Sequence, residues 1–267
     1  MMDFKPFRIK FSMVGTNPLN DKKLFTELLD VIESYPEFAP QFWSLEERGK
    51  LSYNRDDILN IVRGITTRMT CERIYLKRNK AAKYVGSIGV MPKQYINFEF
   101  DPKLNSKHYP ALFEFADRLV QVFKPDIASI HIYRPYADEP WESERDEHIE
   151  MMGEAAFLAP VDYFDVGPKG LAMRTYLGPH YVKQFGQELL LSTPKTQTEL
   201  QPWGGIRLDL STAPWELTEQ AQIEHWQTAM EHLRPAKVFA EMEVDVEYCD
   251  IECTKAENCT IGGLNYV

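Results

Sequence analysis

Ile96-Asn97-Phe98-Glu99-Phe100 alternates apolar and polar side chains, the pattern of a β-strand with one buried face. The same alternation returns 110 positions later in Ile206-Arg207-Leu208-Asp209-Leu210. Each stretch is followed by a helical apolar pattern that ends at a basic residue and a proline, and then by a further strand pattern. The spacing therefore predicts that residues 96–135 and 206–245 are two copies of one strand–helix–strand unit.

Alternation of apolar and polar side chains predicts strands at Phe7–Val14, Arg73–Arg78, Tyr84–Met91, Tyr95–Phe100, Ile127–Tyr133, Leu171–Leu177, Ile206–Leu210 and Val238–Val246. Helices are expected after Asn20, which can cap the first of them, and from Asp56, Pro110, Pro179 and Thr218. Several strands adjoin with no helix between them. This favours an α+β fold of mixed or antiparallel sheets packed with helices, and disfavours a doubly wound parallel sheet.

A chain of 267 residues can bury a full core. We expect a single α+β domain over residues 1–246, with pseudo-halves at about 1–136 and 166–246 joined by an acidic connector, 137–165. Residues 247–267 have no periodicity and form an acidic, cysteine-containing tail.

The sequence has no run of apolar residues that would suit a signal peptide or a membrane helix, so a cytoplasmic location is expected. Four cysteines fit a reducing compartment. Cys249, Cys253 and Cys259 could suggest a metal knuckle, but tight Cys-x2-Cys pairs are missing and no histidine lies close by. Free thiols are the favoured interpretation, and no metal or cofactor is predicted.

The net charge of −10 is concentrated in two segments. Residues 137–165 carry ten acids against Arg145, and residues 241–257 carry seven against Lys255, which leaves the remainder of the chain at about +5. Such segments would repel nucleic acid and attract a basic protein. The alternative is that they are a solvated linker and a solvated tail.

Motifs for phosphate binding, dinucleotide binding, serine hydrolysis and zinc proteolysis are all missing from the sequence. Carboxylates are abundant, but no pair stands out as a general acid and base. We therefore predict that the protein is not an enzyme and has no catalytic residues.

Two tryptophans flank the second alternating strand, Trp203 before Gly204-Gly205 and Trp215 after Pro214. They could serve as core or lid residues. Alternatively, they could be exposed aromatic anchors at a partner surface, where tryptophan is often energetically dominant.

Over roughly positions 7–245 the chain carries a set of short motifs: Phe42-Trp43, Phe98-Glu99-Phe100, Lys124-Pro125-Asp126, Gly170-Leu171-Ala172-Met173-Arg174-Thr175-Tyr176-Leu177 and Gly204-Gly205. In these motifs the sequence resembles bacterial immunity proteins of contact-dependent and type VI toxin systems, in particular the immunity protein 52 family and type VI immunity proteins that neutralise VRR-type nuclease toxins. The resemblance implies tight binding of a cognate toxin without catalysis.

The predicted function is occlusion of a toxin that has a basic cleft, without turnover and without nucleic-acid or membrane binding. The predicted toxin interface consists of Asp138, Glu139, Trp141, Glu142, Glu144, Asp146 and Glu147, with Trp203 and Trp215 as a second choice. A hydrolase or transferase with an unrecognised motif and an adaptor of a secretion apparatus are the alternatives. Gene neighbourhood would separate them.

Overall fold

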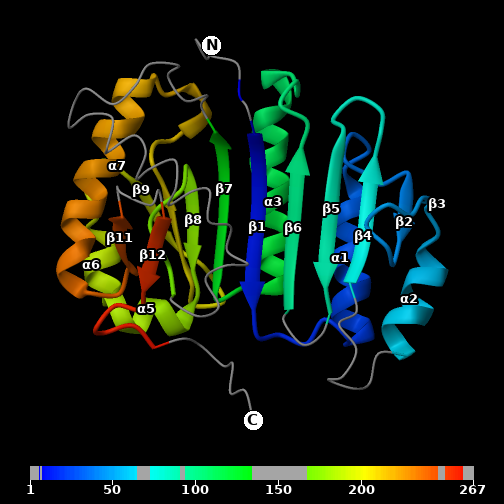
Figure 1. Ribbon diagram of the computed structural model, residues 1–267, viewed down its shortest axis with the longest axis horizontal. Helices are drawn as coiled ribbons and strands as arrows, with labels where there is room; N and C mark the ends of the chain where they lie inside the picture. The colour runs from blue at the N-terminus through cyan, green and yellow to red at the C-terminus, as the bar shows by residue number, and fades with distance from the viewer. Residues whose placement is uncertain are drawn as a thin grey trace.

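A ten-stranded sheet dominates the computed structural model, and every pair of neighbouring strands in it is antiparallel (Figure 1). The structure describes residues 6, 8–64, 73–90, 94–133, 167–245 and 250–260. The strands are β1 (Arg8–Gly15), β2 (Phe42–Ser44), β3 (Leu51–Ser52), β4 (Arg73–Arg78), β5 (Tyr84–Gly89), β6 (Gln94–Phe100), β7 (Ile127–Tyr133), β8 (Arg174–Leu177), β9 (Gln197–Leu200) and β10 (Ile206–Asp209). Their order across the sheet is β3-β2-β4-β5-β6-β1-β7-β8-β10-β9.

Helices and a small second sheet accompany this large sheet. The helices are α1 (Lys22–Ser34), α2 (Arg55–Gly64), α3 (Tyr109–Phe123), α5 (Pro179–Phe185), α6 (Gln187–Leu191) and α7 (Glu219–Leu233). The second sheet pairs β11 (Glu241–Asp245) with β12 (Asp250–Thr254). The fold is therefore α+β, as the adjoining strand patterns predict.

The first core lies between one face of the sheet and the helices α1 and α3, which stand behind the central strands in Figure 1. Alternation in β1 directs Ile9, Phe11 and Met13 to this face, where all three are fully buried. In α1 the apolar positions recur at helical spacing, and Phe25 and Leu28 are buried with them.

The N-cap of α1 differs from the sequence-based expectation. Asp21, not Asn20, is the cap, and its Oδ1 accepts a hydrogen bond from the backbone N–H of Leu24 at 2.8 Å. The two neighbouring residues are both good cap formers, so the sequence does not separate them. The cap is decided by where the backbone leaves the extended conformation.

The second core lies on the opposite face of the sheet. Val14, Ile127, Leu177 and Ile206 occupy matched positions on four successive strands, and all four belong to this cluster. Side chains of α5 and α7 cover them, among them the fully packed Trp226. The helices therefore cover different faces of the sheet in the two parts of the chain.

The duplicated unit is not confirmed. Both copies do have the order strand, helix, strand, as β6–α3–β7 and as β10–α7–β11. However, β7 lies inside the main sheet between β1 and β8, whereas β11 pairs with β12 in the separate sheet. A periodic pattern predicts which face of an element is buried, but not the element against which it packs.

Several elements are absent from the sequence-based prediction. The short strands β2, β3 and β9 and the helix α6 have too few residues for a periodic signal. The strand β12 falls in the tail, where no periodic structure is predicted, and its register with β11 runs from Glu241 opposite Thr254 to Asp245 opposite Asp250.

Within the described ranges, no helix combines the length and the apolar character needed to cross a membrane. Residues 134–166, which include the acidic connector, lie outside the described residues.

Candidate functional site

The predicted interface residues fall into two groups. Asp138, Glu139, Trp141, Glu142, Glu144, Asp146 and Glu147 lie outside the described residues. Trp203 and Trp215 are described, are half-buried, and pack against the first core. The structure therefore brings both tryptophans to the α3 face of the sheet, one on each side of β10 in the sequence.

Trp203 lies in the turn between β9 and β10, where Gly204 adopts a φ of +88°. Its indole ring covers Gly205, because a Cβ built on that glycine would lie 2.2 Å from the ring. The indole Nε1 is buried without a hydrogen-bond partner in the described part of the chain. The Gly-Gly pair is thus required for the turn itself and for the close approach of the ring.

Trp215 follows β10, in a short 3-10 turn from Pro214 to Glu216. Its ring lies 4.7 Å from that of Phe113 on α3, at an interplanar angle of 56°. The guanidinium carbon of Arg174 lies over the ring of Phe113, 5.1 Å from the centroid of that ring. Trp215 is therefore connected through Phe113 to a charged network.

The charged network joins α3 to β8 and β10. Arg174 is 8% exposed and donates to Asp117 Oδ2 at 2.9 Å and to both carboxylate oxygens of Asp209. Arg207 pairs with Asp209 at 3.0 Å and with Glu199 on β9 at 2.7 Å. The network therefore crosses three neighbouring strands and one helix.

Tyr176 completes the network by donating its hydroxyl proton to Asp117 Oδ1. Burial raises the pKa of this hydroxyl well above its ordinary value. Burial also opposes the charge of Arg174, but Tyr176, Asp209 and Asp117 outweigh that effect and raise the guanidinium pKa. Arg174 is thus a permanent cation. Burial raises the pKa of Asp209, and the nearby charges of Arg174 and Arg207 oppose that rise.

We call the face that carries Trp203, Arg207, Glu199 and Trp215 the tryptophan surface. Its charged groups become more exposed toward the edge of the sheet, from Asp209 at 3% to Glu199 at 56% of the side chain. Tryptophan, tyrosine and arginine are the residues that most often dominate protein interfaces. The arrangement suits binding, because its side chains are fixed before a partner arrives.

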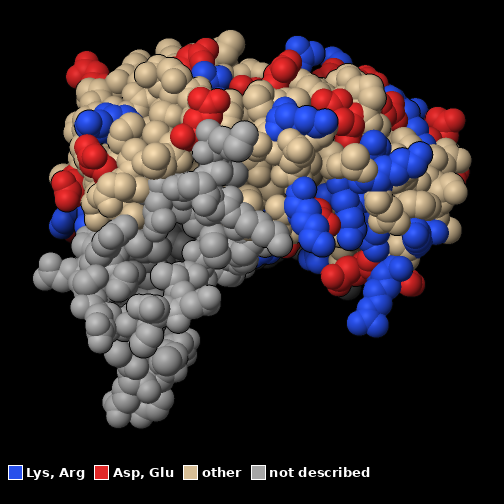
Figure 2. Space-filling model, turned by 90° about the horizontal axis from the view of Figure 1, so that it is seen from above, with Lys and Arg blue, Asp and Glu red and all other residues tan. Residues whose placement is uncertain are grey.

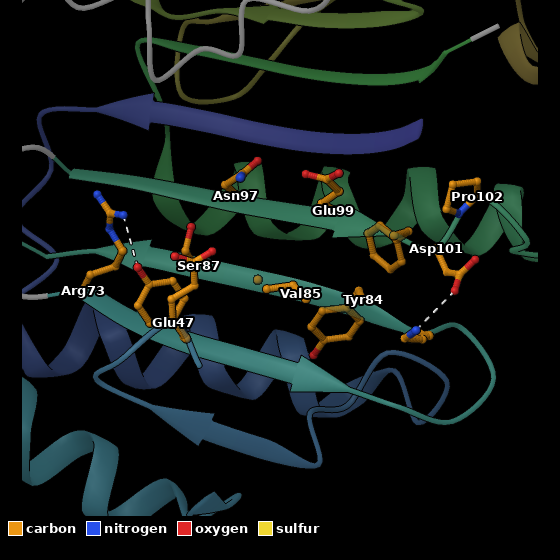
Figure 3. Close-up of a pocket in the computed structure, with 13 residues that line it drawn as sticks. Glu47, Arg73, Tyr84, Val85, Ser87, Asn97, Glu99, Asp101 and Pro102 are labelled. Atoms are coloured by element: carbon orange, nitrogen blue, oxygen red, sulfur yellow. Dashed lines mark hydrogen bonds and ion pairs between the residues drawn. The ribbon is translucent and has the colours of Figure 1, made fainter. Parts of the chain in front are cut away.

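A second surface, which sequence reasoning missed, is a trough of about 490 Å³ along β5 on the face of the sheet opposite α1 and α3 (Figure 3). The short side chains of Val85 and Ser87 on β5 form its floor. Larger side chains of β4 and β6, among them Tyr75 and Asn97, form its walls. The Ser87 hydroxyl has no hydrogen-bond partner among the described residues. The Ser12 hydroxyl donates a hydrogen bond to Asn97 Oδ1 at 2.6 Å.

The carboxylates at the trough are largely matched by cations. Glu99 pairs with Arg8 at 2.8 Å, and Asp101 pairs with Lys83 at 3.6 Å. The sequence signal for this surface is weak, since the pattern of β5 predicts only that Val85 and Ser87 point outward from a strand. The register of β4, β5 and β6 is needed to bring the lining residues of the three strands together.

No group of three or more metal-ligating side chains occurs within the described ranges. Cys259 is a buried free thiol whose pKa is raised by burial, and its Sγ lies against Gly167. Cys249 lies outside the described residues, so the three-cysteine spacing is not assembled in the described part of the chain.

No family model matches the sequence, and no curated protein matches it significantly. Among solved structures, the chain is similar to Pseudomonas aeruginosa T6SS protein PA0821, with 13% sequence identity. The similarity covers 85% of this chain and 72% of that chain, with a TM-score of 0.49.

Proposed function

We propose that this protein is an immunity protein that binds a cognate antibacterial toxin and occludes its active site in a stoichiometric complex. The toxin would be a type VI or contact-dependent effector, and a nuclease is the class that best fits the charge. The observation that carries the proposal is the segment 137–165, with ten acids against one base. A toxin that acts on nucleic acid has a basic cleft, which such a segment can enter in place of phosphates.

The tryptophan surface supports the proposal because it offers aromatic and arginine side chains in addition to Trp141, the one tryptophan of the acidic segment. Long-range charge mainly accelerates encounter, whereas desolvated aromatic and arginine side chains mainly slow dissociation. Trp215 packs on Phe113, and Arg207 is held by Glu199 and Asp209, so little side-chain entropy remains to be lost on binding. A prearranged surface of this kind is compatible with inhibition that requires no turnover.

The test is co-expression of the protein with the toxin encoded beside its gene, scored as cell survival. Survival that requires the protein and scales with its amount supports stoichiometric inhibition. Purified toxin and protein should then form a complex whose formation abolishes toxin activity at a one-to-one ratio. The matched control is an unrelated acidic protein of similar net charge, which should give no protection.

The outcomes separate the alternatives. If the protein protects cells at amounts far below those of the toxin, it acts catalytically and the proposal fails in favour of a modifying enzyme. If the protein binds components of a secretion apparatus and gives no protection, it is an adaptor. A metabolic gene neighbourhood with no toxin gene would also contradict the immunity function.

A further inference from the structure

A second charged surface lies at the end of the molecule that carries β2 to β5, where Figure 2 shows lysine and arginine side chains gathered on the right. Residues 45–50 and 77–83 together carry six bases against two acids. Pairing of β2 with β4, with Phe42 opposite Lys77, places the first of these segments beside the second. We call the two segments together the basic end.

Neutral groups, not carboxylates, hold the central cations of the basic end. Lys77 donates its ammonium to the backbone carbonyls of Glu47 and Gly49. Arg78 donates to the carbonyls of Ala39 at 2.7 Å and Ala81 at 3.0 Å. These contacts fix both side chains without neutralising their charge.

Two further cations add to the positive charge of the basic end. Lys50 places its Nζ 4.5 Å above the ring of Phe42, a contact that again orients a cation without cancelling it. Lys80 is exposed in the turn between β4 and β5, and only its backbone N–H is held, by Gln41. On the neighbouring strand β6, Glu99 pairs with Arg8. Just beyond it, Asp101 pairs with Lys83, so one of the six bases of the basic end has a carboxylate partner.

We propose that the basic end is a docking surface for an acidic segment of a partner protein. Cations without counter-charges favour an anionic partner, and the fixed positions of Lys50, Lys77 and Arg78 lower the entropy lost on binding. An acidic protein segment fits better than nucleic acid. A nucleic acid is longer than this small cluster of cations, so the rest of it would meet a protein with a net charge of −10. A short segment need only face the basic end.

This surface is independent of the toxin-binding proposal, because a basic toxin would be repelled here. The two surfaces would allow the protein to hold a basic and an acidic partner together.

The experiment measures binding of a fluorescein-labelled peptide in which glutamate alternates with glycine, and of the matching glutamine–glycine peptide. Fluorescence anisotropy is recorded at about 0.15 M salt, where the Debye length is about 8 Å. The test variant reverses three exposed side chains of the basic end, Arg48→Glu, Lys50→Glu and Lys80→Glu. The matched control reverses three exposed lysines elsewhere, Lys22→Glu, Lys23→Glu and Lys183→Glu, which changes the net charge equally.

The glutamate peptide should bind the wild-type protein, and the glutamine peptide should not. The test variant should weaken binding at least about tenfold, and the control variant about twofold or less, because exposed charge interactions are short-ranged and small individually. Equal loss in both variants would mean that only net charge matters and would overturn the proposal. So would tighter binding of a single-stranded DNA oligonucleotide than of the glutamate peptide. Self-association of the wild-type protein that the test variant abolishes would assign the surface to a second copy instead, and would likewise overturn it.

Discussion

Arg174 and Asp209 lie opposite each other on β8 and β10, and the guanidinium of Arg174 donates to both carboxylate oxygens of Asp209, including Nη2 to Oδ2 at 3.2 Å. Asp209 is 3% exposed, so its charge depends on this contact and on Arg207. The pair joins the second part of the sheet to α3 through Asp117. It is a structural connection between distant parts of the chain.

Replacing Arg174 by methionine should lower the free energy of unfolding by about 3–5 kcal/mol, because it leaves the carboxylate of Asp209 buried without its main partner. Urea denaturation measures this change. The double variant Arg174→Met with Asp209→Leu should recover a large part of the loss, since no isolated charge then remains.

The control for this prediction is Lys195→Ala, which removes an exposed ion pair with Glu224 at 3.3 Å. It should cost less than about 1 kcal/mol. If the Arg174 variant is no less stable than the Lys195 variant, the network does not hold the two parts of the sheet together.

The N-cap of α1 gives a second prediction. Asp21→Ala removes the bond to the Leu24 N–H and should cost about 1 kcal/mol of the free energy of unfolding. Lys22→Ala, at an exposed position in the first turn of α1, should cost about half of that or less. Equal losses in thermal or urea unfolding would show that the helix begins elsewhere.

The turn that holds Trp203 gives a third prediction. Gly205→Ala should displace the indole ring, because the new Cβ would lie 2.2 Å from it, and should cost about 1–3 kcal/mol. Tryptophan fluorescence and urea unfolding measure the two effects. Gly64→Ala is the control, because a Cβ there meets nothing within 4 Å, and it should leave both readouts nearly unchanged. An unchanged fluorescence spectrum in the Gly205 variant would contradict the packing of the Trp203 ring on Gly205.

Alkaline pH should destabilise the protein through its tyrosines. Burial, followed by the nearby charge of Glu114, raises the pKa of Tyr35 from 10.0 to about 12. Burial also raises the pKa of Tyr53 and Tyr84. In the folded protein these hydroxyls keep their protons at pH values where the unfolded chain releases them.

The protonated tyrosines make their full contribution to the free energy of unfolding below pH 10. That contribution is lost as the pH rises toward 12. The free energy of unfolding should therefore fall across this interval, with the tyrosinate absorbance appearing as the protein unfolds. Tyr35→Phe should show a shallower fall. A free energy that stays constant over the interval would rule out the raised pKa values.

The acidic connector gives the final prediction, which rests on the proposed function. Reversing Asp138, Glu139, Glu142 and Glu144 to lysine together should slow toxin association severalfold, most strongly at low salt, where the Debye length is about 30 Å at 0.01 M. Trp141→Ala should instead speed dissociation. Stopped-flow mixing and surface-based kinetics measure the two rates. Association of the reversed variant at the wild-type rate would move the interface to the tryptophan surface.

The sequence by itself determined the type and approximate bounds of the long elements. Alternation fixed β4 and β7 at their observed ends, and Pro179 marked the start of α5. Lys124, which has a φ of +52°, closes α3 where the lysine–proline pair predicts an end. These features are local, since periodicity and backbone restriction by proline act over a few residues.

Only the tertiary structure decided which elements meet. Asp117 and Arg174 are 57 residues apart, and no pattern in the sequence links them. The tryptophan surface, the trough and the basic end each depend on strand register or on turns that join segments distant in the chain. Periodicity determines the face of a strand that is buried, but the partner and the register follow from how the whole sheet packs. For this protein, the sequence therefore determined the elements and the uneven charge, and the assembled sheet determined the surfaces.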